Sequence, residues 1–172
     1  MEPAFQDPRV RRLLDRAEIA DVLGRYAYGM DARDWDMVRS CWAEKIAFDF
    51  TGLDLWDEPL ESVDREVWMR TLQAFFAALP ASQHLNTPVL YEFDGDDRCT
   101  VIAVLHAKHW RPNESGDPLQ TVVGYYRDEL IRTDDGWKIC AMKEEVQFNE
   151  GNAFVLDASV ASMLRTLREE TA

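Results

Sequence analysis

One aspartate and two of the three histidines have the spacing expected of an acid–base group. Asp31 directly follows an apolar repeat typical of a helix, His84 opens a segment of alternating polarity, and His109 lies near the end of the next such segment. A turn centred near residue 96 separates the two segments. Antiparallel pairing about this turn sets His109 opposite the start of the preceding strand, where His84 lies. His106 has the opposite parity and falls on the other face.

The expected group of two imidazoles and one carboxylate has a clear chemical use. A carboxylate fixes the tautomer of a histidine and raises its basicity, and the imidazole then accepts a proton near neutral pH. Two alternatives stay open from the residues alone. Two histidines and one carboxylate are also the ligand set of an iron centre, although no local metal-ligand spacing occurs. Each of the residues could equally be structural, with Asp31 ending a helix and Tyr26 packing in the core.

Other catalytic and cofactor motifs do not occur in the sequence. There is no Gly-x-Ser-x-Gly turn for a nucleophilic serine and no glycine-rich phosphate loop. Cys41, Cys99 and Cys140 match neither a disulfide framework nor a zinc spacing, and a reducing compartment is the simpler interpretation. We therefore expect chemistry without a metal or a cofactor.

The first part of the chain predicts helices that could position Asp31. Apolar residues recur at three- and four-residue steps from about residue 9 to 30, after an Asp7-Pro8 start signal. Asp34 can cap a short second helix whose apolar face is Trp35, Val38, Cys41 and Trp42. A strand follows over 46–51, ending at Gly52. Asp64 can cap a third helix that runs to Leu79.

The second part of the chain predicts long strands. Alternating segments cover 84–93, 99–111, 120–132 and 137–148, joined by turns at 94–97 and 134–136 and by a polar loop at 112–118. A final amphipathic segment, 157–168, is expected to cover either a pocket mouth or a neighbouring subunit. Helices followed by hairpin-linked strands predict a single α+β domain over 1–172, with a core of about 9–148 and an extension from 149. The curved sheet and the N-terminal helices would enclose an apolar pocket.

Charge and hydrophobicity limit the partners. The net charge of −13 argues against nucleic acid and against an anionic membrane surface. The first residues do not resemble a secretion signal, and no apolar run reaches the ~20 residues of a membrane span, so we expect a cytoplasmic protein. The segment 99–111 is apolar on both faces, with Cys99, Val101 and Ala103 on one and Ile102 and Val104 on the other. We expect another subunit to cover the second face.

Three stretches of the chain resemble the SnoaL-like and scytalone dehydratase-like family, whose fold is shared with nuclear transport factor two and ketosteroid isomerase. The first is residues 17–36, with the run Tyr-Ala-Tyr-Gly-Met-Asp that ends at Asp31, followed by 48–52. The second is Ser82-Gln-His84 with Asn86, and the third is 135–139. This resemblance implies a cone-shaped α+β barrel, no cofactor, and a homo-oligomer, a trimer in preference to a dimer.

The resemblance also implies roles for residues. Asp31, His84 and His109 fall where scytalone dehydratase has its aspartate and two histidines, and hexachlorocyclohexane dehydrochlorinase shares the pair matching Asp31 and His84. Tyr26 matches a tyrosine of the bile acid 7α-dehydratase family. Departures affect the substrate-orienting groups, since pocket tyrosines of the family appear here as Phe50 and Met30. A serine and an asparagine align near Tyr125 and Arg127, which makes scytalone itself an unsuitable substrate.

The resulting hypothesis is a cofactor-independent dehydratase acting on a small hydrophobic cyclic or polyketide-like molecule. His84, paired with Asp31, would remove a proton next to a carbonyl, Tyr26 would bind the developing enolate oxygen, and His109 would protonate the departing hydroxyl. Isomerase or cyclase activity with the same residues is one alternative, and a non-catalytic binding or assembly module is another. The expected pocket residues are mostly aromatic: Trp35, Trp42, Phe50, Trp68, Phe75, Asn86, Leu105, Tyr125 and Tyr126.

Overall fold

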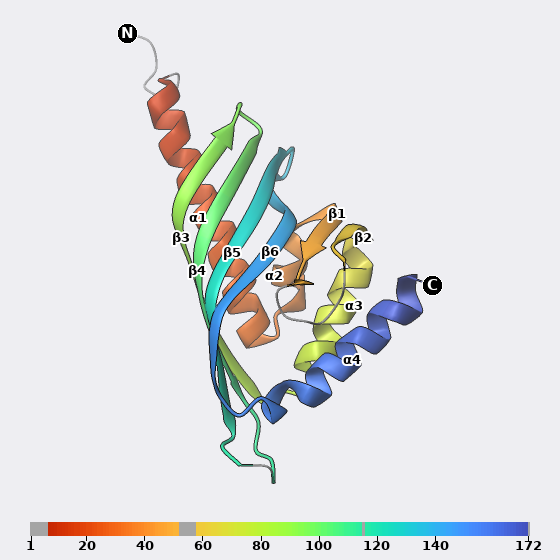
Figure 1. The fold of residues 1–172 in the computed structure, drawn as a ribbon. Coiled ribbons are helices and arrows are strands. Elements are labelled where there is room, and N and C mark those ends of the chain that lie inside the picture. The colour runs from red at the N-terminus through yellow and green to blue at the C-terminus, as the bar shows by residue number, and fades with distance from the viewer. Residues whose placement is uncertain (1–6, 52–57, 115, 172) are drawn as a thin grey trace.

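A six-stranded curved sheet forms the centre of the computed structural model, which describes residues 7–51, 58–114 and 116–171. Helices lie at both ends of the chain (Figure 1). The elements, in chain order, are α1 (Pro8–Ala32), α2 (Trp35–Ser40), β1 (Trp42–Asp49), β2 (Leu60–Asp64), α3 (Arg65–Phe76), β3 (Ala81–Asp94), β4 (Arg98–Trp110), β5 (Leu119–Thr133), β6 (Gly136–Gly151) and α4 (Phe154–Thr171). The predicted α+β class is confirmed.

The strand order is β2-β1-β6-β5-β4-β3. β1 runs parallel to β6, and all other neighbours are antiparallel, so the sheet is mixed. It curves strongly but stays open, with β2 and β3 as its edges, and it is therefore not a closed barrel. A register shift at Gly124, where a Cβ atom would lie 2.2 Å from the Glu145 carbonyl oxygen, marks a bulge between β5 and β6. Bulges of this kind increase the local bend of a sheet.

Helix α1 carries Asp31 to the sheet. The Asp7 side chain accepts a hydrogen bond from the backbone N–H of Arg9, and Pro8 occupies the first turn, as the sequence predicts. The helix packs along β3 and against β6, and it ends at Arg33, whose φ of 60° lies in the left-handed region. Because few non-glycine residues adopt this conformation, it needs support from the surrounding contacts, which the Arg33 side chain supplies at the site described below.

The β3–β4 hairpin has the predicted register. Ser82 pairs with His109 and His84 with Ala107, which places the two cavity histidines on neighbouring strands and on the same face. His106 pairs with Leu85 on the opposite face. The turn and the period of two therefore suffice to place these side chains.

Several predicted boundaries are wrong. Trp42 begins β1 instead of ending the second helix, because the helix stops at Ser40. The short strand β2 was not predicted, and the predicted strand end at Gly52 lies outside the described residues. Asp64 stands at the N-cap of α3 without making a capping hydrogen bond, since its carboxylate pairs with Lys45 at 2.8 Å. Helix α3 ends at Phe76, before the predicted Leu79.

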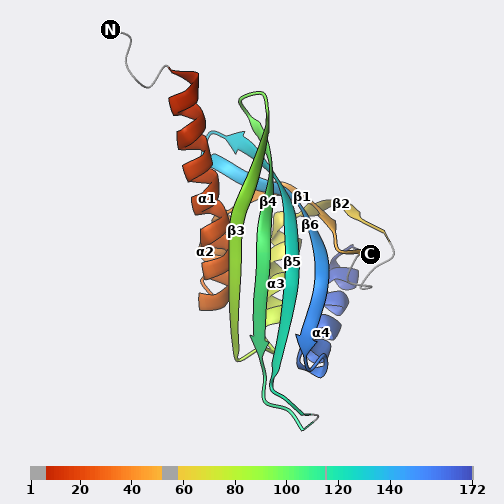
Figure 2. The same cartoon turned by 60° about the vertical axis from the view of Figure 1, so that its left-hand side comes forward.

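Helix α4 packs against α3 and lies over the sheet on the side of the cavity (Figures 1 and 2). It is longer than the predicted segment 157–168, and its buried residues Val155, Met163 and Leu167 contribute to the protein interior. The sequence analysis expected this segment to cover either a pocket mouth or a neighbouring subunit, and α4 lies over the cavity of its own chain. No described helix has the length and apolar character required to traverse a lipid bilayer.

No helix among the described residues covers the other face of β3, β4 and β5 (Figure 2). Large apolar side chains are exposed along it and its borders: Leu85, Val89, Leu90, Val104, Trp110, Tyr125 and Phe148. Apolar area of this kind commonly marks a contact between subunits.

The expectation of a homo-oligomer therefore stays a prediction with a direct test. Sedimentation equilibrium should give the mass of a trimer or a dimer, and Val104→Asp should shift the protein toward the monomer because a charge would enter the apolar face. Leu13→Asp, at an exposed residue of α1 away from this face, is the matched control. A wild-type monomer would contradict the prediction.

A second prediction concerns the buried Asp15, which accepts hydrogen bonds from Arg132 and, at 3.5 Å, from the Trp137 indole. Asp15→Ala leaves both donors without this partner and should lower the free energy of unfolding by about 2 kcal/mol. Lys45→Ala removes an exposed ion pair and should change the free energy of unfolding by less than about 1 kcal/mol. Urea denaturation of the two variants checks the difference, and equal effects would contradict it.

Candidate active site

Asp31 and His84 form a hydrogen-bonded pair between the end of α1 and the start of β3. Asp31 Oδ1 lies 2.7 Å from His84 Nδ1, and Asp31 Oδ2 accepts the backbone N–H of His84 at 2.7 Å. The Ser82 hydroxyl donates to Asp31 Oδ1 at 2.8 Å. The exposed fractions of the two side chains are 19% for Asp31 and 5% for His84. One strand thus supplies three donors to a single carboxylate.

Arg33 holds this arrangement from behind. Its guanidinium donates to the Ser82 hydroxyl at 3.0 Å and to the Leu79 carbonyl at 2.9 Å, and it lies 4.5 Å from the centre of the Phe76 ring. The left-handed backbone of Arg33 therefore lets one side chain join the end of α1 to the start of β3.

The hydrogen bonds decide the charge of Asp31. Burial alone would raise the pKa of this carboxyl, but the interactions with the His84 ring, the His84 backbone N–H and Ser82 outweigh burial and hold the pKa below its usual value. Because an ionised carboxylate can only accept, the shared proton lies on His84 Nδ1, and in the neutral imidazole the lone pair is then on Nε2. This is the protonation state that a general base requires.

A second series of hydrogen bonds, through Gln120 and Asn149, holds His109. Gln120 Nε2 donates to Asn149 Oδ1 at 3.2 Å, so Gln120 Oε1 faces His109 and accepts its Nδ1–H at 2.9 Å. Burial, together with the nearby His84, lowers the pKa of His109 to about 4. A neutral imidazole whose one N–H is already bound cannot donate a proton to a leaving group. The expected role of His109 as proton donor is therefore revised to that of a hydrogen-bond acceptor.

The two imidazoles lie among aromatic side chains. Their ring centroids are 5.3 Å apart with nearly perpendicular planes. Phe76 lies 5.7 Å from His84, and Phe75 lies 6.0 Å from His109, both edge to face. These contacts help to fix the orientations of the two imidazole rings.

A cavity of about 610 Å³ opens beside the histidines, large enough for a small cyclic molecule. Its walls are mainly apolar and come from α1, α3, α4 and strands β3 to β6. Seven of the predicted site residues line it: Tyr26, Phe50, Trp68, Phe75, His84, His109 and Tyr126. Asp31 lies behind His84 and reaches the cavity only through it.

Five predicted pocket residues do not line this cavity. The prediction that Tyr125 lines the pocket is wrong because adjacent strand residues face opposite sides of the sheet. Tyr126 points inward, and Tyr125 is 41% exposed on the outer face. Trp42 and Leu105 are fully buried behind the lining residues, and Trp35 packs on Phe76. Asn86 faces inward on β3, but its amide is buried outside the cavity wall.

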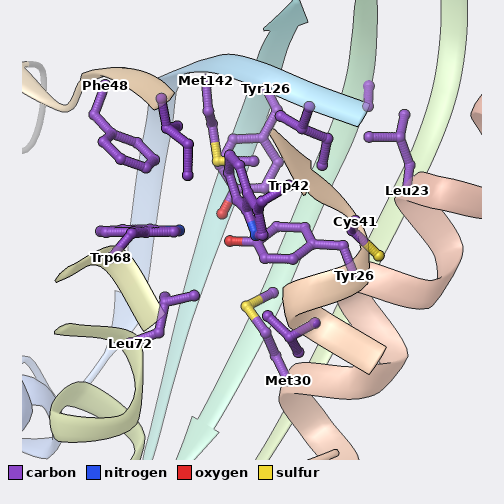
Figure 3. Packing of buried hydrophobic residues seen from close by; sticks show 14 of the residues in the cluster. Leu23, Tyr26, Met30, Cys41, Trp42, Phe48, Trp68, Leu72, Tyr126 and Met142 are labelled. Carbon is purple, nitrogen blue, oxygen red and sulfur yellow. The ribbon is translucent and has the colours of Figure 1, made fainter. Parts of the chain in front are cut away.

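Trp42 does not line the cavity, but it supports residues that do. Its ring contacts those of Tyr26, Phe48 and Trp68, with centroids 5.1, 5.6 and 6.0 Å away (Figure 3). It therefore braces the two aromatic residues, Tyr26 and Trp68, that do face the cavity.

Several lining residues were missed by sequence reasoning. Gln120 and Asn149 hold His109, and Leu156, Val160 and Leu164 of α4 close one wall. Glu144 also faces the cavity. The available signal was its parity with Met142 and Val146, which the charged neighbours Lys143 and Glu145 obscure.

Acidic groups gather at the part of the cavity formed by α1, β5 and β6. The Tyr26 and Tyr126 hydroxyls point toward the same place (Figure 3). Burial first, and then the nearby carboxyls, raise the pKa of both phenols well above the usual value. Burial raises the pKa of Glu144 to about 7 and also raises that of Asp128. These raised pKa values favour the protonated forms of the groups, which can donate hydrogen bonds, in contrast to Asp31, whose pKa is lowered.

The described side chains are not arranged as the ligands of a metal ion. Asp31 and His84 are turned toward each other in a hydrogen bond and do not converge on a shared point. Within residues 7–51, 58–114 and 116–171, no three His, Cys, Asp or Glu side chains are grouped so that they could hold an ion.

The pKa of His109 predicts a pH dependence of stability. The folded value of about 4 lies below the ordinary 6.5, so the unfolded chain binds this proton more strongly. The contribution is complete above pH 6.5 and falls by roughly 1 kcal/mol per unit as the pH drops toward 4. Glu144 has the opposite sign, since its raised pKa makes stability fall as the pH rises from 4.5 to about 7.

Because the two effects oppose each other, the informative quantity is the difference between wild type and His109→Gln. The loss of stability between pH 7 and pH 5 in urea denaturation should be smaller in the variant. His106→Gln, on the outer face of the same strand, serves as the comparison. If the free energy of unfolding of His109→Gln changed with pH as it does in wild type, the assignment of His109 as buried and neutral would be contradicted.

Comparison with known proteins places the chain in a family. The model of the SnoaL-like domain matches residues 11–143, whereas no curated protein matches in sequence. Kfla4162 from Kribbella flavida is 30% identical, with a TM-score of 0.76 over 87% of this chain and 98% of that one.

Two other solved structures share the fold at lower identity. A candidate scytalone dehydratase from Novosphingobium aromaticivorans is 16% identical, with a TM-score of 0.71 over 84% of this chain and 91% of that one. Hexachlorocyclohexane dehydrochlorinase LinA-type3 from Novosphingobium barchaimii is 18% identical, with a TM-score of 0.69 over 84% and 94%. The resemblance noted in the sequence is thereby confirmed: the chain belongs to the family of SnoaL-like domains, with the fold of nuclear transport factor two.

Proposed function

We propose that this protein is a cofactor-independent lyase, a dehydratase that removes water from a small hydrophobic cyclic or polyketide-like molecule. One observation carries the proposal: an ionised Asp31 holds the Nδ1–H of His84, which leaves His84 Nε2 as a base at the edge of an apolar cavity. Two proteins of this fold, named for dehydratase and dehydrochlorinase activities, are consistent with an elimination.

The proposed reaction begins with proton removal. His84 Nε2 takes a proton from the carbon next to a substrate carbonyl, and Asp31 stabilises the imidazolium that forms. The Tyr26 hydroxyl donates to the carbonyl oxygen as enolate charge develops, and an interaction made with that charge lowers the barrier. His109 Nε2 accepts a hydrogen bond from a substrate hydroxyl and so orients the ring.

The cavity walls favour this chemistry. Aromatic side chains surround the two histidines, and an apolar, water-poor chamber strengthens each electrostatic contact with the enolate. The walls also fit a flat apolar ring better than a polar sugar or a nucleotide. A homo-oligomer in the cytoplasm would be consistent with this function without being required by it.

His84→Ala should reduce turnover of cyclic β-hydroxy ketones by about 10²–10⁴-fold, because the base is lost while the fold is kept. His106→Ala is the matched control on the outer face. Mass spectrometry of the product decides the reaction type: loss of water fits the dehydratase, and an unchanged mass favours the isomerase or cyclase alternative. Full activity of His84→Ala would refute the assigned base, and ligand binding without any conversion would favour a binding module.

A further inference from the structure

A carboxyl group outside the Asp31–His84 pair faces the same cavity. On β6 the side chains of Met142, Glu144 and Val146 point inward, whereas Lys143 and Glu145 point outward and are exposed. Glu144 is thus an acidic residue in an otherwise apolar inward row, and it lines the cavity directly.

A neighbouring tyrosine contacts Glu144, and burial raises the pKa of its carboxyl. Tyr126 is its register partner on β5, and the two side chains interact. Burial raises the pKa of Glu144 to about 7 in spite of the opposite influence of Tyr126, so about half of the molecules carry the proton at neutral pH. The other titratable groups around the cavity, from the elements that enclose it, are Tyr26, His84, His109, Asp128, Glu150 and Asp157.

In the resting state neither histidine offers an unbound N–H to the leaving oxygen. His84 has its proton bound to Asp31, and His109 has its own bound to Gln120. We propose that Glu144 is the general acid that protonates the departing hydroxyl, with Tyr126 as the residue that positions it; this inference rests on the proposed function. The Tyr26 and Tyr126 hydroxyls point toward each other (Figure 3), and both tyrosines interact electrostatically with Glu144.

The step balances in protons and electrons. The α-proton moves to His84 Nε2, and the electron pair of that C–H bond forms the enolate. As the enolate collapses, the carbon–carbon double bond forms, the C–O bond breaks, and the leaving oxygen takes the Glu144 proton to become water. His84 then returns a proton to the Glu144 carboxylate through solvent, which restores the resting state.

The arrangement specifies a substrate class. In a β-hydroxy carbonyl compound, the two oxygens are held on carbons separated by one atom, so they lie close together at one end. Tyr26 and Glu144 interact electrostatically and offer adjacent donors to such a pair of oxygens. The α-carbon between them would then face the base from the other side of the cavity.

The test compares two leaving groups in wild type and Glu144→Gln. Turnover of a cyclic β-hydroxy ketone should fall about 10²-fold in the variant, because hydroxide leaves poorly without a proton. Turnover of the β-acetoxy counterpart should change by less than about tenfold, because acetate leaves as a stable anion. Tyr126→Phe should shift the two rates in the same sense, and Glu145→Gln, at the neighbouring outward residue, should change neither. Equal losses for both substrates, or none, would overturn the proposal.

Two further readouts separate this proposal from the proposed function. Deuterium exchange at the α-carbon of the parent ketone, which has no leaving group, requires His84 but not Glu144. Its loss in His84→Ala and its retention in Glu144→Gln would support both assignments. No exchange in wild type would defeat the proposed function. Infrared difference spectra of wild type against Glu144→Gln report the carboxyl without a substrate. An ionised Glu144 at about pH 6 would overturn its role as acid whatever the substrate.

Discussion

The need to keep a charged, partly buried carboxylate at the end of α1 shapes the whole site. Asp31 is ionised because three donors from β3 compensate for the water that it has lost. Those donors are available only if β3 starts where α1 ends. Arg33 meets this condition, since its left-handed backbone turns the chain and its guanidinium joins Ser82 to the Leu79 carbonyl. A single hydrogen-bonded carboxylate thereby fixes the relation between helix and sheet and also the tautomer of His84.

The cavity has two chemically different ends. Near Asp31 and His84, hydrogen bonds stabilise a negative charge and present a lone pair. Near Tyr26, Tyr126 and Glu144, burial raises the pKa of the acids and so favours their protonated forms. One end can therefore remove a proton while the other donates hydrogen bonds or protons to oxygen. The same physical variable, the degree to which burial is compensated, separates the pKa values of the carboxyls and gives them different tasks.

Much of this could be predicted from the sequence because it depends on local rules. The hairpin turn and the alternation of polarity fix the register that joins His84 to His109, and the helix periodicity fixes the place of Asp31. Other features depend on contacts between distant segments. The parity of Tyr125 and Tyr126 could not be assigned from an apolar run in which both are aromatic. The charged neighbours of Glu144 obscure its inward parity. The position of α4 over the cavity depends on its packing against α3. Strand β2 is short and is defined by its partner β1.

Family membership accounts for one end of the cavity more fully than for the other. The matched region, residues 11–143, contains Asp31, His84 and His109 but stops one residue before Glu144 and excludes α4. Elimination and isomerisation both begin with proton removal by such a base, and they differ in whether the next proton goes to a leaving oxygen or back to carbon. That choice belongs to the groups facing the base. Under the proposed mechanism those groups are Tyr126 on β5, Glu144 on β6 and the wall formed by α4, and of these Glu144 and α4 lie beyond the matched region.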